Sequence, residues 1–311
     1  MSSINSSEIC TPFISIESSA NCTMSPVSDI LVPIARPDWP ALRVLFETSD
    51  LETEIPCNTI QNYIDWTERD PKIRHLEILS LNDSWRQNGT FIVLDRHEMF
   101  FFSLEPSNES LERALELIDW DFPYRTYGIL DKHQLVMKRV LQKLNVPFPN
   151  VSVACNLYLL PKEVGLGLEV LPPPAGFRLA ELKVHHAQII NATWAFRSGA
   201  SEYAITRCIA WNTNVGLFDE QNELVAWCLL NNLGIICVLY TVEAYRRRGL
   251  AEVVLRAMVT KLANQGMNSV ASVLLSNAPS RALFEKLGFE GDATLHDTCH
   301  RVDRLVEWNF F

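Results

Sequence analysis

The sequence predicts a mixed α+β protein built from two domains. Three observations support this fold class. Apolar segments of strand length alternate with amphipathic segments of helical length along the 311 residues. A hydrophobic content of 48% and a charged content of 21% are ordinary for a globular protein with a sizeable core. One segment, residues 161–177, concentrates proline and glycine and separates two long globular stretches.

Residues 1–32 are rich in serine and poor in large apolar side chains, which predicts a loosely ordered tail. Within it, only Phe13–Ile16 has the composition of a short strand. The tail lacks the features of a secretory signal, and its acidic residues Glu8 and Glu17 argue against a mitochondrial transit peptide. No apolar run is long enough to span a membrane. We expect a cytoplasmic protein, while a mitochondrial location stays open.

Residues 33–162 have the pattern of a complete α+β domain, which we expect to be the N-terminal domain. Helices are predicted over "DWPALRVLFETS", "TIQNYIDWTERD", "SNESLERALELI" and "DKHQLVMKRVLQKLN". Strands are predicted over "RHLEILSL", "TFIVLD", "EMFFFSLE", "TYGIL" and "VSVACNLYLL".

A Pro/Gly linker is predicted at residues 163–175, and a second domain at residues 176–311. The second domain has the expected order β-α-α-β-β-β-α-β-α-β. Its segments are "FRLAEL", "KVHHAQIINATWAF", "SEYAITRCIAWN", "NVGLFD", "ELVAWCLL", "GIICVLYTV", a long helix to about Gly266, "SVASVLL", "APSRALFEKLG" and a final strand region from Phe289.

The balance of charges and the cysteine spacing exclude several function classes. A net charge of −10 argues against a general nucleic-acid binder, which needs a broad basic face. An anionic ligand must therefore be held by a local site. None of the eight cysteines forms a C-x-x-C pair, so neither a zinc ribbon nor a redox motif is indicated. We expect no metal and a reducing compartment.

Such a local site is predicted at "VEAYRRRGLAEVVL", Val242 to Leu255, where three arginines precede a helix. The helix begins near Gly249 without an obvious side-chain cap, so its first N–H groups are free to bind an anion. Gly249 has no Cβ to obstruct the approach, and the arginines add positive charge. The alternative is a solvated charge run. The segment is neither a Walker loop nor a G-x-G-x-x-G motif.

A second element, "SNAPSRALFEKLGFE", follows the next strand, with Asn277 at the strand's end and Gly288-Phe289 ending the helix. In combination with R-x-x-G-x-A at Arg246, Gly249 and Ala251, this order resembles the GCN5-related N-acetyltransferase (GNAT) superfamily over roughly residues 177–300. The two motifs in the right order are more specific than either one alone.

The resemblance implies that coenzyme A, as acyl-CoA, is a co-substrate. The loop and helix amides would bind its pyrophosphate, and the strand Cys237–Thr241 would pair with the pantetheine arm. A β-bulge would splay that strand from the next one and admit the arm. Asn277 would bond the arm from the far wall. The predicted coenzyme A contacts are Leu239, Tyr240, Thr241, Arg246, Arg247, Arg248, Gly249, Leu250, Ala251, Asn277, Arg281 and Phe284.

Within the superfamily, the "YTVEAYRRRGLAEVVLRAM", "INATWAF" and "SEYAITRCI" segments resemble the glycine N-acyltransferases and their relatives. Those proteins carry a degenerate acyltransferase-like domain in front of the functional one. The implied activity is transfer of an acyl group from a CoA thioester to the amine of a small acceptor, such as glycine or another amino acid, by direct attack in a ternary complex. No metal, nucleic acid or membrane span is implied, and the oligomeric state stays open.

The sequence departs from the family pattern at two catalytic positions. Phe284 stands where many members have a tyrosine that protonates the leaving thiolate, and Ile235 stands where glycine N-acyltransferases have a glutamate base. An amine is mostly protonated at neutral pH, so some group must accept a proton. Glu243 is the weak candidate for this catalytic role.

Other residues support weaker hypotheses, and two other functions stay open. His185 and His186 are further candidate bases, Glu202 and Tyr203 could shape acceptor specificity, and Trp194, Trp211 and Trp227 are expected in the core or in a pocket wall. The alternative functions are a peptide or protein N-acetyltransferase and a non-catalytic acyl-CoA-binding protein, the second suggested by Phe284 and Ile235.

Overall fold

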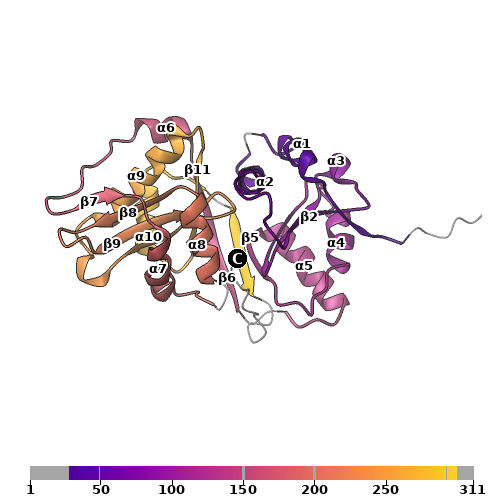
Figure 1. Cartoon of the computed structure of the whole chain (residues 1–311). Coiled ribbons are helices and arrows are strands. Elements are labelled where there is room, and N and C mark those ends of the chain that lie inside the picture. The colour runs from indigo at the N-terminus through magenta and orange to yellow at the C-terminus, as the bar shows by residue number, and fades with distance from the viewer. Residues whose placement is uncertain (1–27, 49, 149–150, 199–200, 292, 300–311) are drawn as a thin grey trace, which may run out of the picture.

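A single sheet runs through the whole molecule. The computed structural model describes residues 28–48, 50–148, 151–198, 201–291 and 293–299. The predicted strand at Phe13–Ile16 lies outside them. Twelve strands form the sheet, in the order β1-β2-β3-β4-β5-β12-β6-β11-β10-β9-β8-β7 (Figure 1). The predicted mixed α+β fold class is confirmed.

The N-terminal half contains every strand and helix that the sequence predicts there. Helix α2 begins earlier than expected because Asp50 caps it, accepting a hydrogen bond of 3.0 Å from the Glu52 amide. Strand β1 and helix α3 are additions to the predicted set. The elements are β1 Leu31–Pro33, α1 Trp39–Val44, α2 Leu51–Arg69, β2 Leu76–Leu81, α3 Trp85–Asn88, β3 Phe91–Asp95, β4 Glu98–Phe102, α4 Glu109–Glu116, β5 Arg125–Leu130, α5 Asp131–Lys143 and β6 Val151–Leu160.

The C-terminal half follows the predicted order of strands and helices. Part of the expected linker is instead a helix, α6, which packs on α9. A Cβ on Gly165 would lie 3.1 Å from Ala263 Cβ, so this close contact requires a glycine. The elements are α6 Lys162–Gly167, β7 Arg178–Ala180, α7 Ala187–Thr193, α8 Ser201–Trp211, β8 Asn214–Phe218, β9 Leu224–Leu230, β10 Ile235–Thr241, α9 Leu250–Asn264, β11 Ser269–Leu274, α10 Ala278–Lys286 and β12 Thr294–Cys299.

The two halves exchange their last strands. In each half four antiparallel strands, β1 to β4 and β7 to β10, are followed by a parallel neighbour, β5 beside β4 and β11 beside β10. The last strand of the first half, β6, then pairs with β11, and the last strand of the second half, β12, pairs with β5. Strands β6 and β12 also pair with each other, and Figure 1 shows β12 in yellow between the two halves. The sequence places β6 in the N-terminal domain, whereas both strands that pair with it, β11 and β12, belong to the C-terminal half. The division into domains stays a prediction.

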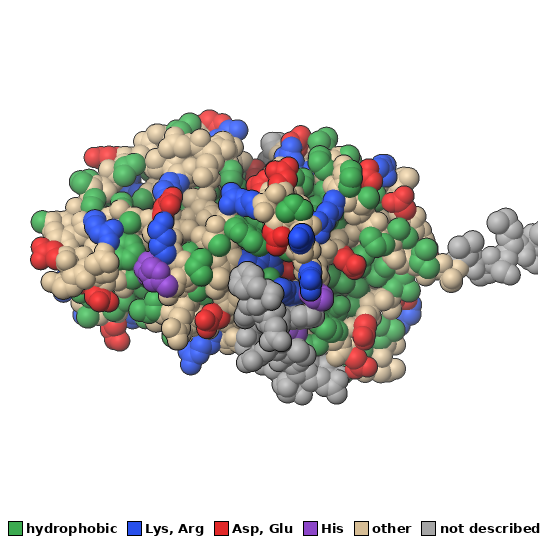
Figure 2. All heavy atoms as spheres, viewed as in Figure 1, with side chains coloured by type: hydrophobic (Ala, Val, Ile, Leu, Met, Phe, Trp, Pro, Cys, Tyr) green, Lys and Arg blue, Asp and Glu red, His purple; other side chains and the backbone are tan. Residues whose placement is uncertain are grey.

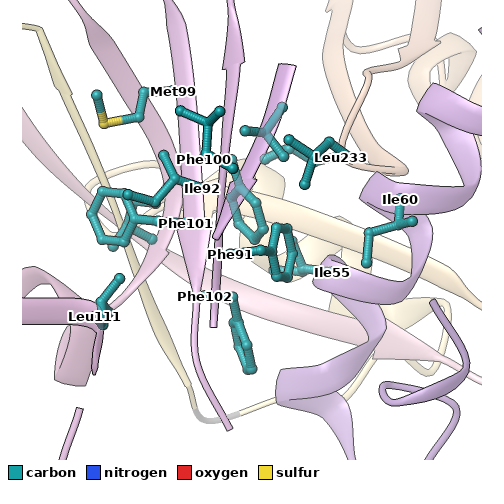
Figure 3. Packing of buried hydrophobic residues seen from close by; sticks show 14 of the residues in the cluster. Ile55, Ile60, Phe91, Ile92, Met99, Phe100, Phe101, Phe102, Leu111 and Leu233 are labelled. Carbon is teal, nitrogen blue, oxygen red and sulfur yellow. The ribbon is translucent and has the colours of Figure 1, made fainter. Parts of the chain in front are cut away.

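The hydrophobic core of the N-terminal half extends across the junction. Phe91, Phe100 and Ile55 pack together with Leu233, which comes from the β9–β10 turn of the other half (Figure 3). Gly128 lies against this leucine with a φ of +68°, and a Cβ there would lie 2.5 Å from Leu233 Cδ1. A larger residue at position 128 would push the turn out of the core.

The visible surface carries charges of both signs. Lys and Arg side chains are interspersed with Asp and Glu side chains over the face shown in Figure 2. On this face, therefore, an anion is attracted locally rather than by a continuous basic surface. Among the described helices, none has the length and apolar character needed to cross a membrane.

A buried ion pair joins the two halves on the α8 side of the sheet. The Arg207 guanidinium donates two hydrogen bonds of 2.9 Å to the two carboxylate oxygens of Asp95. The two side chains are 7% and 1% exposed, and the guanidinium carbon lies 4.1 Å from the centre of the Trp66 ring. Removing one partner would leave the other charge buried and unpaired.

We expect Arg207→Leu to lower the free energy of unfolding by about 3–5 kcal/mol, because the Asp95 carboxylate stays buried without its partner. The double variant Arg207→Leu/Asp95→Leu removes both charges and should recover most of the loss. Urea denaturation followed by circular dichroism measures both. A loss under about 1 kcal/mol in the single variant would contradict the assignment.

Candidate functional site

An outer groove lies where the end of β10 meets the start of α9 and the start of α10. Its volume is about 560 Å³. Nine of the twelve predicted coenzyme A contacts line it: Leu239, Tyr240, Thr241, Arg246, Arg247, Gly249, Leu250, Ala251 and Asn277, alongside Tyr245, Glu252, Pro279, Ser280 and Leu283. The structure therefore gathers two distant motifs around one groove.

The floor of the outer groove is the N-terminus of α9. Gly249 precedes the helix with a φ of +75° and provides no side-chain cap, as the sequence predicts. Arg247 also has a positive φ, +63°. In the described part of the chain, the amides of residues 247–251 donate no hydrogen bond. Such a turn of outward N–H groups is an anion-binding nest at the positive end of a helix dipole.

Helix α4 has the corresponding place in the N-terminal half, but its N-terminus is closed. Glu105 Oε2 accepts a hydrogen bond of 2.7 Å from the Ser110 amide, and Ser107 Oγ accepts one of 3.3 Å from the Glu109 amide. At α4, therefore, a carboxylate and a hydroxyl each satisfy one N-terminal amide, whereas the first amides of α9 have no partner among the described residues. The negative charge of Glu105 would also repel a phosphate. Of these two described helices, only α9 therefore has an N-terminus that is open to an anion.

The three arginines surround the nest unequally. Arg246 and Arg247 line the groove, and Arg246 Nε donates to the Thr241 carbonyl at 3.1 Å. Arg248 does not line it, since its Nη2 donates to the Ala244 carbonyl at 3.3 Å. The arginines are exposed and make no ion pair with the described residues, so their charge is available to a ligand.

One acidic side chain, Glu252, also lines the groove. It is paired with Lys286 at 2.6 Å and Arg256 at 3.1 Å. The hydrogen bond from Lys286 is the main cause of its lowered pKa. Its charge is therefore compensated and adds little repulsion toward an anion beside the nest.

Strand β10 separates from its parallel neighbour β11 after two residue pairs. Only Ile235 and Ile236 pair with β11, and the register with β9 shifts between Cys237 and Tyr240. Val238, within this bulge, has a φ of +51°. A left-handed conformation is rare for a β-branched residue and indicates local strain held by the surrounding structure. The predicted bulge and splay are confirmed.

Three of the predicted coenzyme A contacts lie elsewhere. Phe284 is buried between Tyr158 and Phe289, with ring centroids 6.2 and 5.0 Å away, and belongs to the core. Arg281, like Arg248, is not among the residues that line the groove. Asn277 does line it, but its side chain also caps α10, accepting a hydrogen bond of 3.2 Å from the Ser280 amide.

A second, inner cavity lies beside the bulge, lined by residues of both halves. Its volume is about 180 Å³. Cys237 and Val238 line it, while the next residues, Leu239 to Thr241, line the outer groove, so the two cavities share the bulge of β10. Three charged side chains also line the inner cavity: Glu98, Arg125 and Asp297. Sequence reasoning missed all three.

The candidate acids and bases from the sequence do not reach the inner cavity. Glu243 is exposed at the start of a 3-10 turn, and the rings of His185 and His186 contact each other, tilted by 52° with centroids 4.0 Å apart. Helix α8 does line the cavity, but through Ala204, Ile205 and Cys208 rather than through Glu202 or Tyr203. Tyr203 lies instead under the guanidinium of Arg96, 3.8 Å from its ring centre.

The three tryptophans divide as expected between core and pocket wall. Trp194 lines the inner cavity, Trp227 is fully buried, and Trp211 packs on Trp66 with ring centroids 5.3 Å apart. Ile235 lines the inner cavity as an apolar residue.

Comparisons with known proteins agree with this geometry. The family model described as FR47-like protein matches residues 214–301. A glycine N-acyltransferase from Pongo abelii is 29% identical over 63% of this chain and 75% of its own length. The chain is glycine N-acyltransferase-like. Its similarity to these relatives supports the GNAT superfamily and an N-acyltransferase.

Solved structures show a similar fold that extends through both halves of this chain. A Drosophila protein of 20% identity superposes with a TM-score of 0.79 over 90% of this chain and 99% of that one. A tandem GNAT protein from the clavulanic acid biosynthesis pathway, 14% identical, gives a TM-score of 0.54 over 87% and 98%. At these identities, the likeness concerns the fold alone.

We expect Gly249→Ala to weaken coenzyme A binding at least tenfold, about 1.4 kcal/mol, because the methyl group and the strained φ disturb the nest. Gly266→Ala is the matched control. Gly266 ends the same helix with a φ of +79° and, like Gly249, has open space where the methyl group of an alanine would lie. Isothermal titration calorimetry with coenzyme A should find normal affinity in the control. Equal affinity in the two variants would contradict a nest at Gly249.

Proposed function

We propose that this chain transfers an acyl group from a CoA thioester to the amine of a small acceptor, such as glycine or another amino acid, by direct attack in a ternary complex. The observation that carries the proposal is the meeting of two cavities at the bulge of β10. The outer groove supplies the anion nest, and the inner cavity supplies room for the reacting groups.

The splay between β10 and β11 supports a path for the pantetheine arm. Beyond Ile236, β10 has no β11 partner, so the edge that faces β11 is free to bond an extended chain. A diphosphate at the nest would place the arm along Leu239 to Thr241 and the thioester beside Val238. Strand and loop amides near the bulge could then polarise the thioester carbonyl, and positioning alone accounts for much of the rate in such reactions.

The cysteines of the inner cavity support direct transfer rather than an acyl-enzyme. Cys155, Cys208 and Cys237 line the cavity. Burial raises the pKa of all three thiols, to about 11 for Cys155. They are therefore protonated at neutral pH, and a thiol is a poor nucleophile compared with a thiolate.

The size of the inner cavity favours a small acceptor over a peptide. Its volume of about 180 Å³ is a third of that of the outer groove, about 560 Å³. A non-catalytic acyl-CoA-binding protein would need only the outer groove. The charged inner cavity therefore favours turnover.

We expect release of free CoA thiol when the protein is incubated with acetyl-, benzoyl- or longer acyl-CoA and a pool of amino acids that includes glycine. A thiol-reactive dye measures the release. Binding of acyl-CoA without thiol release from any amino acid or amine would favour the non-catalytic alternative. Release with peptides alone would favour a peptide N-acetyltransferase.

We also expect the intact mass of the protein to stay unchanged after incubation with acyl-CoA in the absence of an acceptor, because no cavity thiol is ionised to accept the acyl group. Electrospray mass spectrometry measures this. A stable increase by one acyl group, lost on adding an amino acid, would show a covalent intermediate instead.

A further inference from the structure

The inner cavity brings together one cation and two carboxylates from three strands. Arg125 begins β5, Glu98 begins β4, and Asp297 lies in the exchanged strand β12. Much of the remaining wall is apolar and includes Trp194, Leu229 and Ile235. A cluster of positive and negative side chains inside a cavity is unusual, because burying ionised groups costs free energy unless they are paired.

The guanidinium of Arg125 lies against an aromatic ring, and no carboxylate forms an ion pair with it among the described residues. Its carbon lies 4.7 Å from the centre of the Trp194 ring. Burial raises the pKa of both carboxyl groups, and Arg125 is close enough for its charge to oppose part of that rise. A planar donor held on an aromatic face suits a ligand carboxylate.

The two carboxylates are held differently. Glu98 Oε2 accepts hydrogen bonds from Tyr127 at 2.9 Å and from the Asn232 side-chain amide at 3.1 Å. Asp297 accepts one bond of 2.8 Å, through Oδ1, from the Gly128 amide. Both bonds to Glu98 come from side chains that fix it, whereas Oδ2 of Asp297 has no bond from the described residues.

We propose that the inner cavity binds a small zwitterionic α-amino acid, with Arg125 pairing its carboxylate and Asp297 accepting a proton from its ammonium group. This inference rests on the proposed function and gives it an acceptor class and a base. Glu98 acts as a positioning residue that balances the charge of the ammonium group. An apolar acyl chain in the same space would offer no opposite charge to any of the three ionised side chains.

Two protons leave the ammonium group during the transfer. Asp297 takes one of them, and the free amine forms the N–C bond to the thioester carbonyl carbon. The C–S bond then breaks, and the second proton of the former ammonium group passes to the thiolate sulfur. The products are the N-acyl amino acid and free coenzyme A, and the proton on Asp297 leaves to water.

The surroundings of Asp297 suit a group that exchanges protons. Burial is the main cause of its raised pKa, opposed by the Gly128 amide and by the charges of Arg125 and His296. Glu98 lines the same cavity, and burial raises the pKa of the Cys155 and Cys237 thiols, so both are uncharged at neutral pH. A base acts only when deprotonated, so activity should fall as the pH drops through this raised pKa.

Arg125→Gln tests the carboxylate contact. With glycine, the KM should rise at least tenfold, while the KM for acetyl-CoA changes less than twofold. Glycinamide, which lacks the carboxylate, should react equally well with both proteins. The matched control is Arg139→Gln, which removes an exposed arginine paired with Glu112. Equal losses with glycine and glycinamide, or a raised KM for acetyl-CoA, would overturn the assignment and indicate an acyl pocket.

Asp297→Asn tests the base. We expect kcat to fall at least about 100-fold and the acid limb of the pH profile to disappear, with acetyl-CoA binding unchanged. Asparagine keeps an oxygen for the Gly128 amide, so thermal stability should be retained. An unchanged pH profile in a folded variant would overturn the role of Asp297.

A direct binding measurement separates this inference from the proposed function. Titration of glycine into the protein saturated with coenzyme A should give a heat signal that Arg125→Gln abolishes. If no acyl-CoA is turned over but this binding is present, the acceptor cavity stands and the proposed activity fails. If glycine does not bind the wild-type complex, the acceptor cavity is refuted even where thiol release with other amines is found.

Discussion

The separation of β10 from β11 is the constraint on which the rest of the site depends. Two parallel strands pair at only two positions and then diverge, because β10 bulges at Val238 in a strained left-handed conformation. Cys237 and Val238 line the inner cavity, and the residues that follow them, Leu239 to Thr241, line the outer groove. A regular parallel ladder would close the slot between β10 and β11.

The exchange of final strands explains why the inner cavity is built from both halves. Strand β12 leaves the C-terminal half to pair with β5, and β6 takes the place beside β11. This arrangement places Asp297 next to Arg125 and Glu98, far away in sequence, and makes the cavity depend on both halves. The Arg207–Asp95 pair and the insertion of Leu233 into the other core hold the same junction.

Helices α4 and α9 occupy equivalent places in the two halves but differ in whether their N-terminal amides are free. Both α4 and α9 follow four antiparallel strands and precede a parallel one. At α4 the Glu105 carboxylate satisfies an amide donor, whereas at α9 Gly249 leaves the donors open and the arginines supply charge. The same fold can therefore lose an anion site through a few residues in one loop, without any change in its sheet.

Local patterns in the chain are sufficient to predict the order of strands and helices, the open N-terminus of α9 and the concentration of arginines beside it. These features depend on periodicity, capping and charge within a few residues of one another. Long-range packing, by contrast, places Phe284 in the core, exchanges β6 and β12, and brings Glu98, Arg125 and Asp297 into one cavity. The physical reason is that the partner of a strand, and the surroundings of a side chain, are set by contacts between distant segments, which leave no local pattern in the chain.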